Sequence, residues 1–204
     1  MLQALLTEVH PAWHRTAVPG LDDALLARAR TSALGRRMLA AWLAEGPGQA
    51  LLAPGLQDAS GLIARWSRPR LDALHRDLGT LAFAPAIRAE IRREPVRRLK
   101  AELGTGYLLA IDRSVWDAQV EPALQSRLAC ELAGALEDGQ SSTLSALLAR
   151  QGEAELQAWA GQREPALAEW ARLLGAPSDA PAPHLPEKPV LIVHTHHQSR
   201  AIAA

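Results

Sequence analysis

The stretch EPALQSRLACELAGALE, residues 121–137, decides the fold class. Its leucines recur at steps of four, which places one apolar stripe along a helix: Leu124, Leu128, Leu132 and Leu136. Glu121 precedes Pro122, and an acid before a proline at the first helical position suits a helix start. The same Glu-Pro pair recurs at 94–95 and 164–165, each time before a run rich in Leu and Ala. The pattern predicts helices throughout the second half of the chain.

Composition extends this prediction to the whole chain. Of 204 residues, 40 are Ala and 34 are Leu, which both favour helices, whereas 7 are Val and 6 are Ile, which favour strands. An all-β fold or a large parallel sheet is therefore excluded. We expect an all-α fold, an irregular bundle of about eight to ten helices, because apolar residues repeat at helical spacing in most segments.

The last part of the chain has a different character. APSDAPAPHLPEKP, residues 176–189, contains five prolines and is typical of a stiff extended linker. VLIVH, residues 190–194, is rich in β-branched side chains and predicts one short strand. We therefore expect a helical domain, 1–175, followed by a Pro-rich linker and a His-containing tail, 176–204.

Charge and cysteine content narrow the class of protein. Lys and Arg number 22 and Asp and Glu also number 22, whereas nucleic-acid binders usually carry a basic excess, so we expect no nucleic acid as partner. The single cysteine, Cys130, forms no internal disulfide, which suits a reducing compartment. The sequence also lacks a signal-peptide pattern and a run of about 18 uncharged apolar residues. We expect a cytoplasmic protein that does not insert into a membrane.

No catalytic signature is found. The phosphate-binding, dinucleotide, zincin and nucleophile-elbow patterns are all missing, so we expect no enzyme and no cofactor. His194, His196 and His197 resemble the opening of the H-x-H-x-D-H metal motif of metallo-β-lactamases, but Gln198 and Ser199 stand where an acid is required. We therefore expect no functional metal site; these three histidines are the candidates if there is one, and a metal-binding enzyme that uses this tail is an alternative.

The most distinctive segment is PAIRAEIRREPVRRLKAEL, residues 85–103. Its apolar stripe consists of Ile87, Ile91, Val96, Leu99 and Leu103. Its basic side chains are Arg88, Arg92, Arg93, Arg97, Arg98 and Lys100. One interpretation is a solvated helix face. The other is a docking face, because arginine forks bind carboxylates and phosphates, and it would suit an acidic protein surface or anionic lipid heads.

The neutral total conceals two regions of opposite charge. Residues 65–113 contain 11 Arg or Lys and 6 Asp or Glu, and residues 121–170 contain 3 Arg and 8 Asp or Glu. Either the two regions face each other inside one bundle, or they form two partner surfaces. Trp13, in the predicted loop HPAWHRTAVPG at 10–20, is a further candidate for partner binding, because tryptophan is enriched at interface hot spots.

The segment from Leu78 to Trp116 is similar to the central region of the SctK proteins, the YscK/PscK/OrgA/MxiK-type accessory components of bacterial type III secretion systems. The matching elements are Leu78-Gly79, Ala86-Ile87-Arg88, Pro95-Val96 with Leu99, and Leu103-Gly104 before a hydrophobic stretch. HPAWHRTAVPG at 10–20 adds a second match, since family members have a Pro-Ala-aromatic segment near the start.

The resemblance implies a virulence-associated role in protein transport and no catalytic activity. SctK proteins belong to the sorting platform below the injectisome, at the cytoplasmic face of the inner membrane. They connect the cytoplasmic domain of the ring protein SctD to the SctQ pods, and SctQ joins SctL and the ATPase SctN. An SctK-like chain would thus be an adaptor with an SctD-like and an SctQ-like partner. The alternative from another class is a helical regulatory or chaperone-like binding domain unrelated to secretion.

Overall fold

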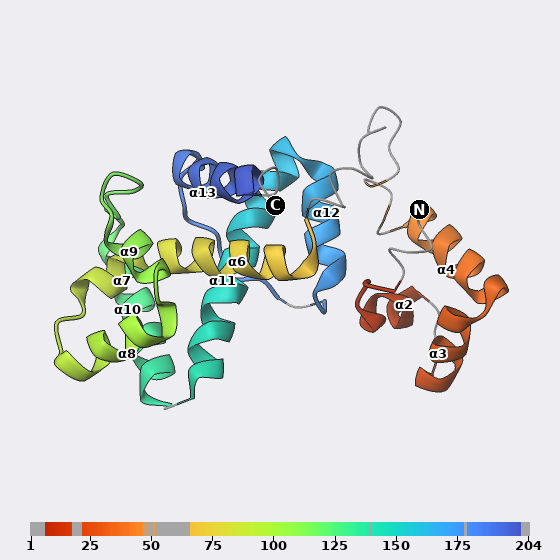
Figure 1. Ribbon diagram of the computed structural model, residues 1–204, viewed down its shortest axis with the longest axis horizontal. Coiled ribbons are helices and arrows are strands. Elements are labelled where there is room, and N and C mark those ends of the chain that lie inside the picture. Colours follow the sequence, from red (N-terminus) through yellow and green to blue (C-terminus); the bar gives the residue numbers. More distant parts are fainter. Residues whose placement is uncertain are drawn as a thin grey trace. The chain divides into compact units, whose positions relative to one another are not determined.

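The computed structural model describes residues 7–17, 22–46, 48, 51, 66–138, 140–177 and 179–200. Within these ranges the chain forms eleven helices and no strand, which confirms the all-α fold. The number of helices is one more than the upper end of the expected eight to ten. The helices belong to two compact units (Figure 1). Unit 1 comprises residues 1–68 and 160–179, and unit 2 comprises residues 69–159 and 180–204. The units therefore divide the chain elsewhere than at residue 175, and residues from 180 onward belong with unit 2.

The first segment of unit 1 contains α2 (Pro11–Ala17), α3 (Asp23–Thr31) and α4 (Ala33–Glu45), and its second segment contains α12 (Pro165–Leu174). The Trp170 indole Nε1 donates a hydrogen bond to the carbonyl oxygen of Trp66 at 2.9 Å, and both side chains are buried. The backbone N–H of His10 bonds to the carbonyl of Leu173 at 2.8 Å, which fixes the start of α2 on α12. The predicted loop at 10–20 is thus wrong over α2, because these contacts hold its residues in a helix.

The first segment of unit 1 contains two short helices, α3 and α4, that meet at Ser32. Ser32 ends α3 and begins α4, because its hydroxyl accepts a hydrogen bond from the N–H of Gly35 at 3.0 Å instead of leaving that position to a continuous helix. A Cβ at Gly35 would lie 2.3 Å from the carbonyl oxygen of Ala29, so the bend requires glycine there.

Unit 2 contains the remaining helices: α6 (Arg68–Ala82), α7 (Ala84–Ala89), α8 (Arg93–Leu103), α9 (Gly106–Ile111), α10 (Pro122–Glu137), α11 (Ser141–Arg163) and α13 (Glu187–Arg200). The predicted stripe of α10 is confirmed, since Leu128, Leu132 and Leu136 are buried. The stretch around Tyr107 is helical and forms α9.

Two glycines bring α6 and α11 into backbone contact where the helices cross (Figure 1). A Cβ at Gly79 would lie 1.8 Å from the carbonyl oxygen of Leu148, and one at Gly152 would lie 1.7 Å from that of His75. We call this pair the glycine crossing. It also explains why a glycine, Gly79, lies inside α6, since a side chain there would keep the two backbones apart.

The predicted strand at 190–194 is wrong, because these residues lie in α13. Glu187 stands in the first turn, where an acid is favourable. One face of the helix is buried, at Val190, Val193, His194 and His197, whereas Leu191 and Ile192 are exposed. The buried side chains of α13 recur at helical spacing and pack within unit 2. This burial outweighs the strand preference of the β-branched side chains.

Candidate functional site

The Arg-rich segment forms the connection from α7 to α8. α7 ends at Ala89, residues 90–92 are non-helical, and α8 begins at Arg93. The Glu90 carboxylate accepts hydrogen bonds from the backbone N–H of Arg92 at 2.8 Å and from its guanidinium Nη2 at 2.6 Å. These bonds from Arg92 lower the pKa of Glu90 to about 2. The connection is therefore a defined loop held by its own side chains.

Two of the predicted docking arginines point into the fold. The Arg88 guanidinium donates hydrogen bonds to the carbonyl oxygens of Ala110 and Asp117, both at 2.7 Å, and of Trp116, at 2.8 Å. Arg98 donates to the carbonyl of Leu136 in the last turn of α10. Both side chains satisfy backbone acceptors at helix ends, and Arg88 also satisfies those of the non-helical residues 116 and 117, which is a structural task.

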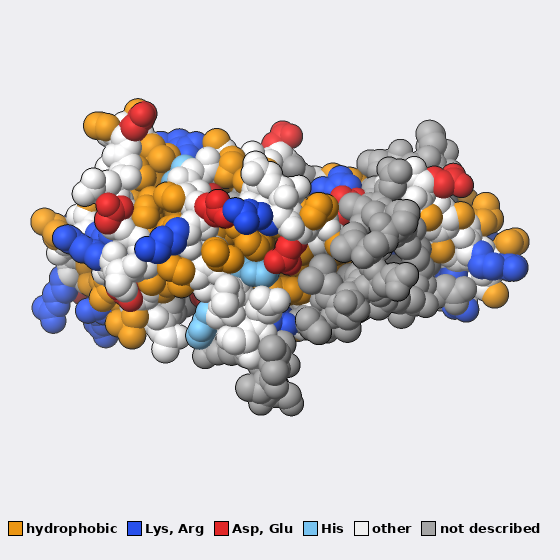
Figure 2. Space-filling model, turned by 90° about the horizontal axis from the view of Figure 1, so that it is seen from above, with side chains coloured by type: hydrophobic (Ala, Val, Ile, Leu, Met, Phe, Trp, Pro, Cys, Tyr) orange, Lys and Arg blue, Asp and Glu red, His pale blue; other side chains and the backbone are white. Residues whose placement is uncertain are grey.

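The basic side chains of the segment that remain exposed are Arg92, Arg93, Arg97 and Lys100. We call the three arginines, together with the exposed Ile91, the basic edge. Ile91 was expected on the apolar stripe with Ile87 and Leu99. Those two are buried, but the side chain of Ile91 is 89% exposed because the helix is broken around it. Lys and Arg side chains gather at the end of unit 2 that carries α7 and α8 (Figure 2). An exposed aliphatic side chain among arginines is the composition of a binding anchor.

Trp13 lies elsewhere, in unit 1, and is half-buried. Its indole Nε1 donates to the carbonyl oxygen of Gly175 at 2.8 Å, and the Arg172 guanidinium lies 4.6 Å from its ring centroid. The structure thus gives Trp13 contacts within its own unit, whereas the arginines of the basic edge belong to unit 2.

The three candidate metal ligands do not converge. His194 stacks on Trp159 with ring centroids 4.6 Å apart, and His197 Nε2 bonds to the Asp77 carboxylate at 2.8 Å. His196 is exposed. Among the residues that the structure describes, no group of three or more His, Cys, Asp or Glu is placed to hold a metal ion.

Burial of histidines in unit 2 predicts acid sensitivity. Burial, with the nearby charges of Arg70 and His197, lowers the pKa of His194 to about 4 from 6.5. The unfolded chain therefore binds a proton between these two values that the folded unit does not, so stability falls as pH falls from 6.5 towards 4. We expect His194 to contribute at most about 1.4 kcal/mol per pH unit in this window.

His194→Phe should make this dependence shallower, because phenylalanine keeps the aromatic contact with Trp159 but does not titrate, while burial of His75, whose pKa is also lowered to about 4, maintains part of the dependence. Urea unfolding of both proteins at several pH values between 7 and 4 measures the slope. An unchanged slope in the variant would contradict the assignment.

A buried carboxylate holds the segment before α13. Glu155 Oε1 accepts from Gln151 Nε2 at 2.7 Å and from the backbone N–H of His184 at 3.0 Å, and Oε2 accepts from the N–H of Leu185 at 2.9 Å. His184 Nε2 completes the arrangement by donating to the carbonyl oxygen of Ala82 at 3.0 Å. We call Gln151, Glu155, His184 and Leu185 the polar latch.

Sequence reasoning did not find the polar latch. The available signal was helical spacing, because Gln151 and Glu155 continue the buried face that Leu144 and Leu148 begin. Two polar residues on a buried helix face require a partner. Nothing in the spacing identifies that partner as the backbone of residues 184 and 185.

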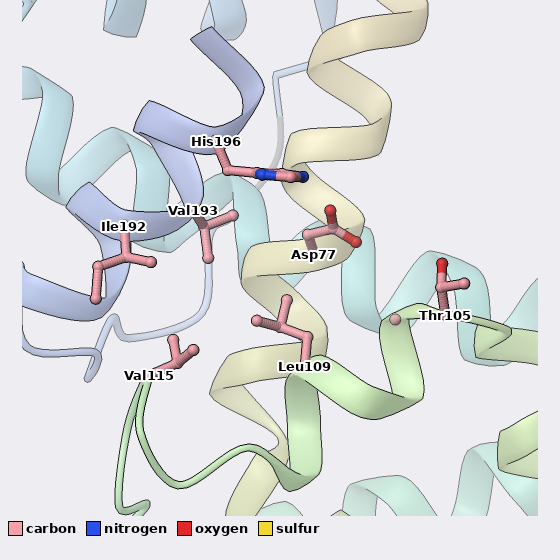
Figure 3. Close-up of a pocket in the computed structure, with 8 residues that line it drawn as sticks. Asp77, Thr105, Leu109, Val115, Ile192, Val193 and His196 are labelled. Carbon is pink, nitrogen blue, oxygen red and sulfur yellow. The ribbon is translucent and has the colours of Figure 1, made fainter. Parts of the chain in front are cut away.

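A cavity of about 400 Å³ lies between α6, α9 and α13. Figure 3 shows Leu109, Val115 and Ile192 as part of its apolar lining, and Asp77 and His196 as polar side chains beside them. Its volume is within the range of sites that take small molecules or protein side chains. It lies wholly within unit 2.

Among the described helices, none combines the length and apolarity that a membrane span requires. Comparisons of the chain with protein-family models, with curated proteins and with solved structures find no match. The basic edge and the cavity of unit 2 are therefore the basis for the function proposed for this chain.

Proposed function

We propose that this chain is a non-enzymatic adaptor of a bacterial type III secretion sorting platform. It would connect an SctD-like ring protein, at the cytoplasmic face of the inner membrane, to SctQ-like pods and through them to SctL and the ATPase SctN. The similarity of residues 78–116 and 10–20 to SctK proteins supports this assignment. The observation that carries it is the basic edge, which lies inside the similar segment and presents exposed side chains.

The chemistry of the basic edge favours an acidic protein partner. Arg93 and Arg97 are exposed, and Arg92 keeps 60% of its side chain exposed although it pairs with Glu90. Guanidinium groups recognise carboxylates in a planar, two-pronged geometry, and Ile91 adds an apolar anchor between them. Charge complementarity at such a rim sets partner choice and association rate.

Charge reversal tests the proposal. In the triple variant Arg92→Glu, Arg93→Glu and Arg97→Glu, we expect capture of one of the two partners, SctD-like or SctQ-like, to weaken at least about tenfold, because three favourable rim charges become repulsive. Binding to both purified partners by surface plasmon resonance measures the effect, and the circular dichroism spectrum should stay unchanged.

The matched control reverses Arg28, Arg37 and Arg113, which are exposed and lie outside the basic edge. It makes the same change in net charge and should leave capture unchanged. Equal losses in both variants would indicate a general charge effect. Capture of neither partner by the unmodified chain would contradict the secretion assignment and favour a helical regulatory or chaperone-like domain.

A further inference from the structure

We propose that the basic edge of one copy of this chain docks into the α9–α13 cavity of a second copy, with Ile91 inserted into the cavity. The contact joins two different surfaces of unit 2, so association is head to tail. This inference does not depend on the secretion partners, because both surfaces belong to this chain.

The first surface is a preformed apolar knob. Ile91 is 89% exposed, more than any other large hydrophobic side chain in the described residues. It is not on a loose loop, because the bonds from Arg92 to Glu90 close the loop directly around it. A side chain held in place before binding loses little freedom when it docks.

The second surface suits an aliphatic side chain that is followed by a cation. Leu109, Val115 and Ile192 supply apolar walls. Asp77 is the one carboxylate among the described lining residues, and its Oδ2 atom bonds to His197. Its Oδ1 atom lies 3.8 Å from the Cβ position of Gly106, another lining residue, and so faces the cavity.

The knob and the cavity match in charge as well as in polarity. Arg92 and Arg93 follow Ile91 directly, so an inserted Ile91 brings a guanidinium to the wall that contains the Asp77 carboxylate. The cavity volume of about 400 Å³ exceeds that of one isoleucine side chain and leaves room for part of an arginine. Ile192, one of the apolar lining residues, is 38% exposed, so this wall of the cavity is accessible from solvent.

A chain cannot fill its own cavity in this way. In Figure 1 the α7–α8 connection lies at the far end of unit 2, away from α13, which forms one wall of the cavity. The contact therefore links separate molecules. A contact between unlike surfaces leaves a free knob and a free cavity at the ends, so association continues into rings or short chains.

Two single variants remove one surface each. Ile91→Asp replaces the knob at an exposed position and should leave folding intact. Gly106→Leu fills the cavity from inside; a Cβ there meets only Asp77 Oδ1, at 3.8 Å, and leucine is a better helix former than glycine. Met38→Asp, at a side chain 65% exposed in unit 1, is the matched control for loss of surface hydrophobicity.

Sedimentation velocity of the purified chain alone tests the proposal. We expect the unmodified chain and Met38→Asp to form larger species as concentration rises through about 10 µM to 1 mM, the range of weak, small interfaces. Ile91→Asp and Gly106→Leu should each remain monomeric up to the same concentration. Mixing these two variants should restore one contact, between the intact cavity of the first and the intact knob of the second, and stop at a 1:1 dimer.

Three results would overturn the proposal. An unmodified chain that stays monomeric to about 1 mM would show no contact of this strength. Continued association of Ile91→Asp, or a mixture that forms no dimer, would exclude this pair of surfaces. Because no partner protein is present, and because Ile91→Asp and Gly106→Leu leave all arginines in place, a failure of self-association leaves the adaptor assignment untouched.

Discussion

Gly152→Ala is expected to unfold unit 2. The added methyl group would lie 1.7 Å from the carbonyl oxygen of His75 and 2.7 Å from the backbone nitrogen of Gly79. Both neighbours are backbone atoms of α6, so no side-chain rotation can make room, and the two helices must separate. We expect a loss of more than about 4 kcal/mol, which removes most of the stability of a typical domain.

The expected change in stability has the opposite sign to that of an ordinary glycine-to-alanine substitution in a helix. In an ordinary helix, glycine to alanine stabilises by up to about 1 kcal/mol, because alanine is the better helix former. Gly134→Ala in α10 is the matched control, since no atom lies within 4 Å of the added Cβ. Urea unfolding followed by circular dichroism should show a strong loss for Gly152→Ala and a small gain for Gly134→Ala. A Gly152→Ala protein as stable as the unmodified chain would refute the backbone contact.

Glu155→Ala is expected to release the segment before α13. The substitution leaves the N–H groups of His184 and Leu185 without their acceptor, whereas the amide of Gln151 loses Glu155 but keeps the carbonyl oxygen of Ala182 at 3.2 Å. Removing one member of a buried, charge-assisted network costs about 3–5 kcal/mol, because the remaining polar groups stay buried and unpaired. The loss should be concentrated where the polar latch holds the chain.

Hydrogen exchange localises this effect. We expect the amides of His184 and Leu185 and those of α13 to exchange faster in Glu155→Ala, whereas the core of α10 keeps its protection. Glu155→Gln keeps one carbonyl acceptor, so its amide exchange rates should lie between those of the unmodified chain and those of Glu155→Ala. Glu131→Ala is the control at an exposed carboxylate, whose contact with Arg127 is long at 3.9 Å, and it should change stability by less than about 0.5 kcal/mol. Identical exchange rates at these amides in Glu155→Ala and in the unmodified chain would contradict the polar latch.

The fold class was predictable because its cause is local. Helix propensity and the leucine spacing of α10 act within a few turns, and the burial of Leu128 and Leu132 confirms the face that the spacing indicates. Helix boundaries were less predictable, since they depend on single competing bonds. Ser32 and Glu90 each bind nearby backbone N–H groups and so break helices that the apolar pattern continues.

The parts of the site that depend on tertiary contacts could not be predicted. VLIVH has the composition of a strand, and only the burial of Val190 and Val193 within unit 2 makes it a helix. Arg88 and Arg98 are chemically identical to Arg93 and Arg97, but the first pair reach backbone carbonyls that lie far along the sequence. The spacing of arginines gives no indication of which of them do so.

Both units are discontinuous in the sequence, and this has a consequence for how the protein is made. Unit 1 needs Trp170 to close on Trp66, and unit 2 needs His184 to reach Ala82, which lies 102 residues earlier. On the ribosome the early helices therefore emerge long before these partners, and the contact of α6 with His184 forms only after a further 102 residues have been synthesised. During that interval its apolar face is available to chaperones or to neighbouring nascent chains. The order of the helices along the chain thus predicts that both units complete their folding late in translation and with the assistance of chaperones.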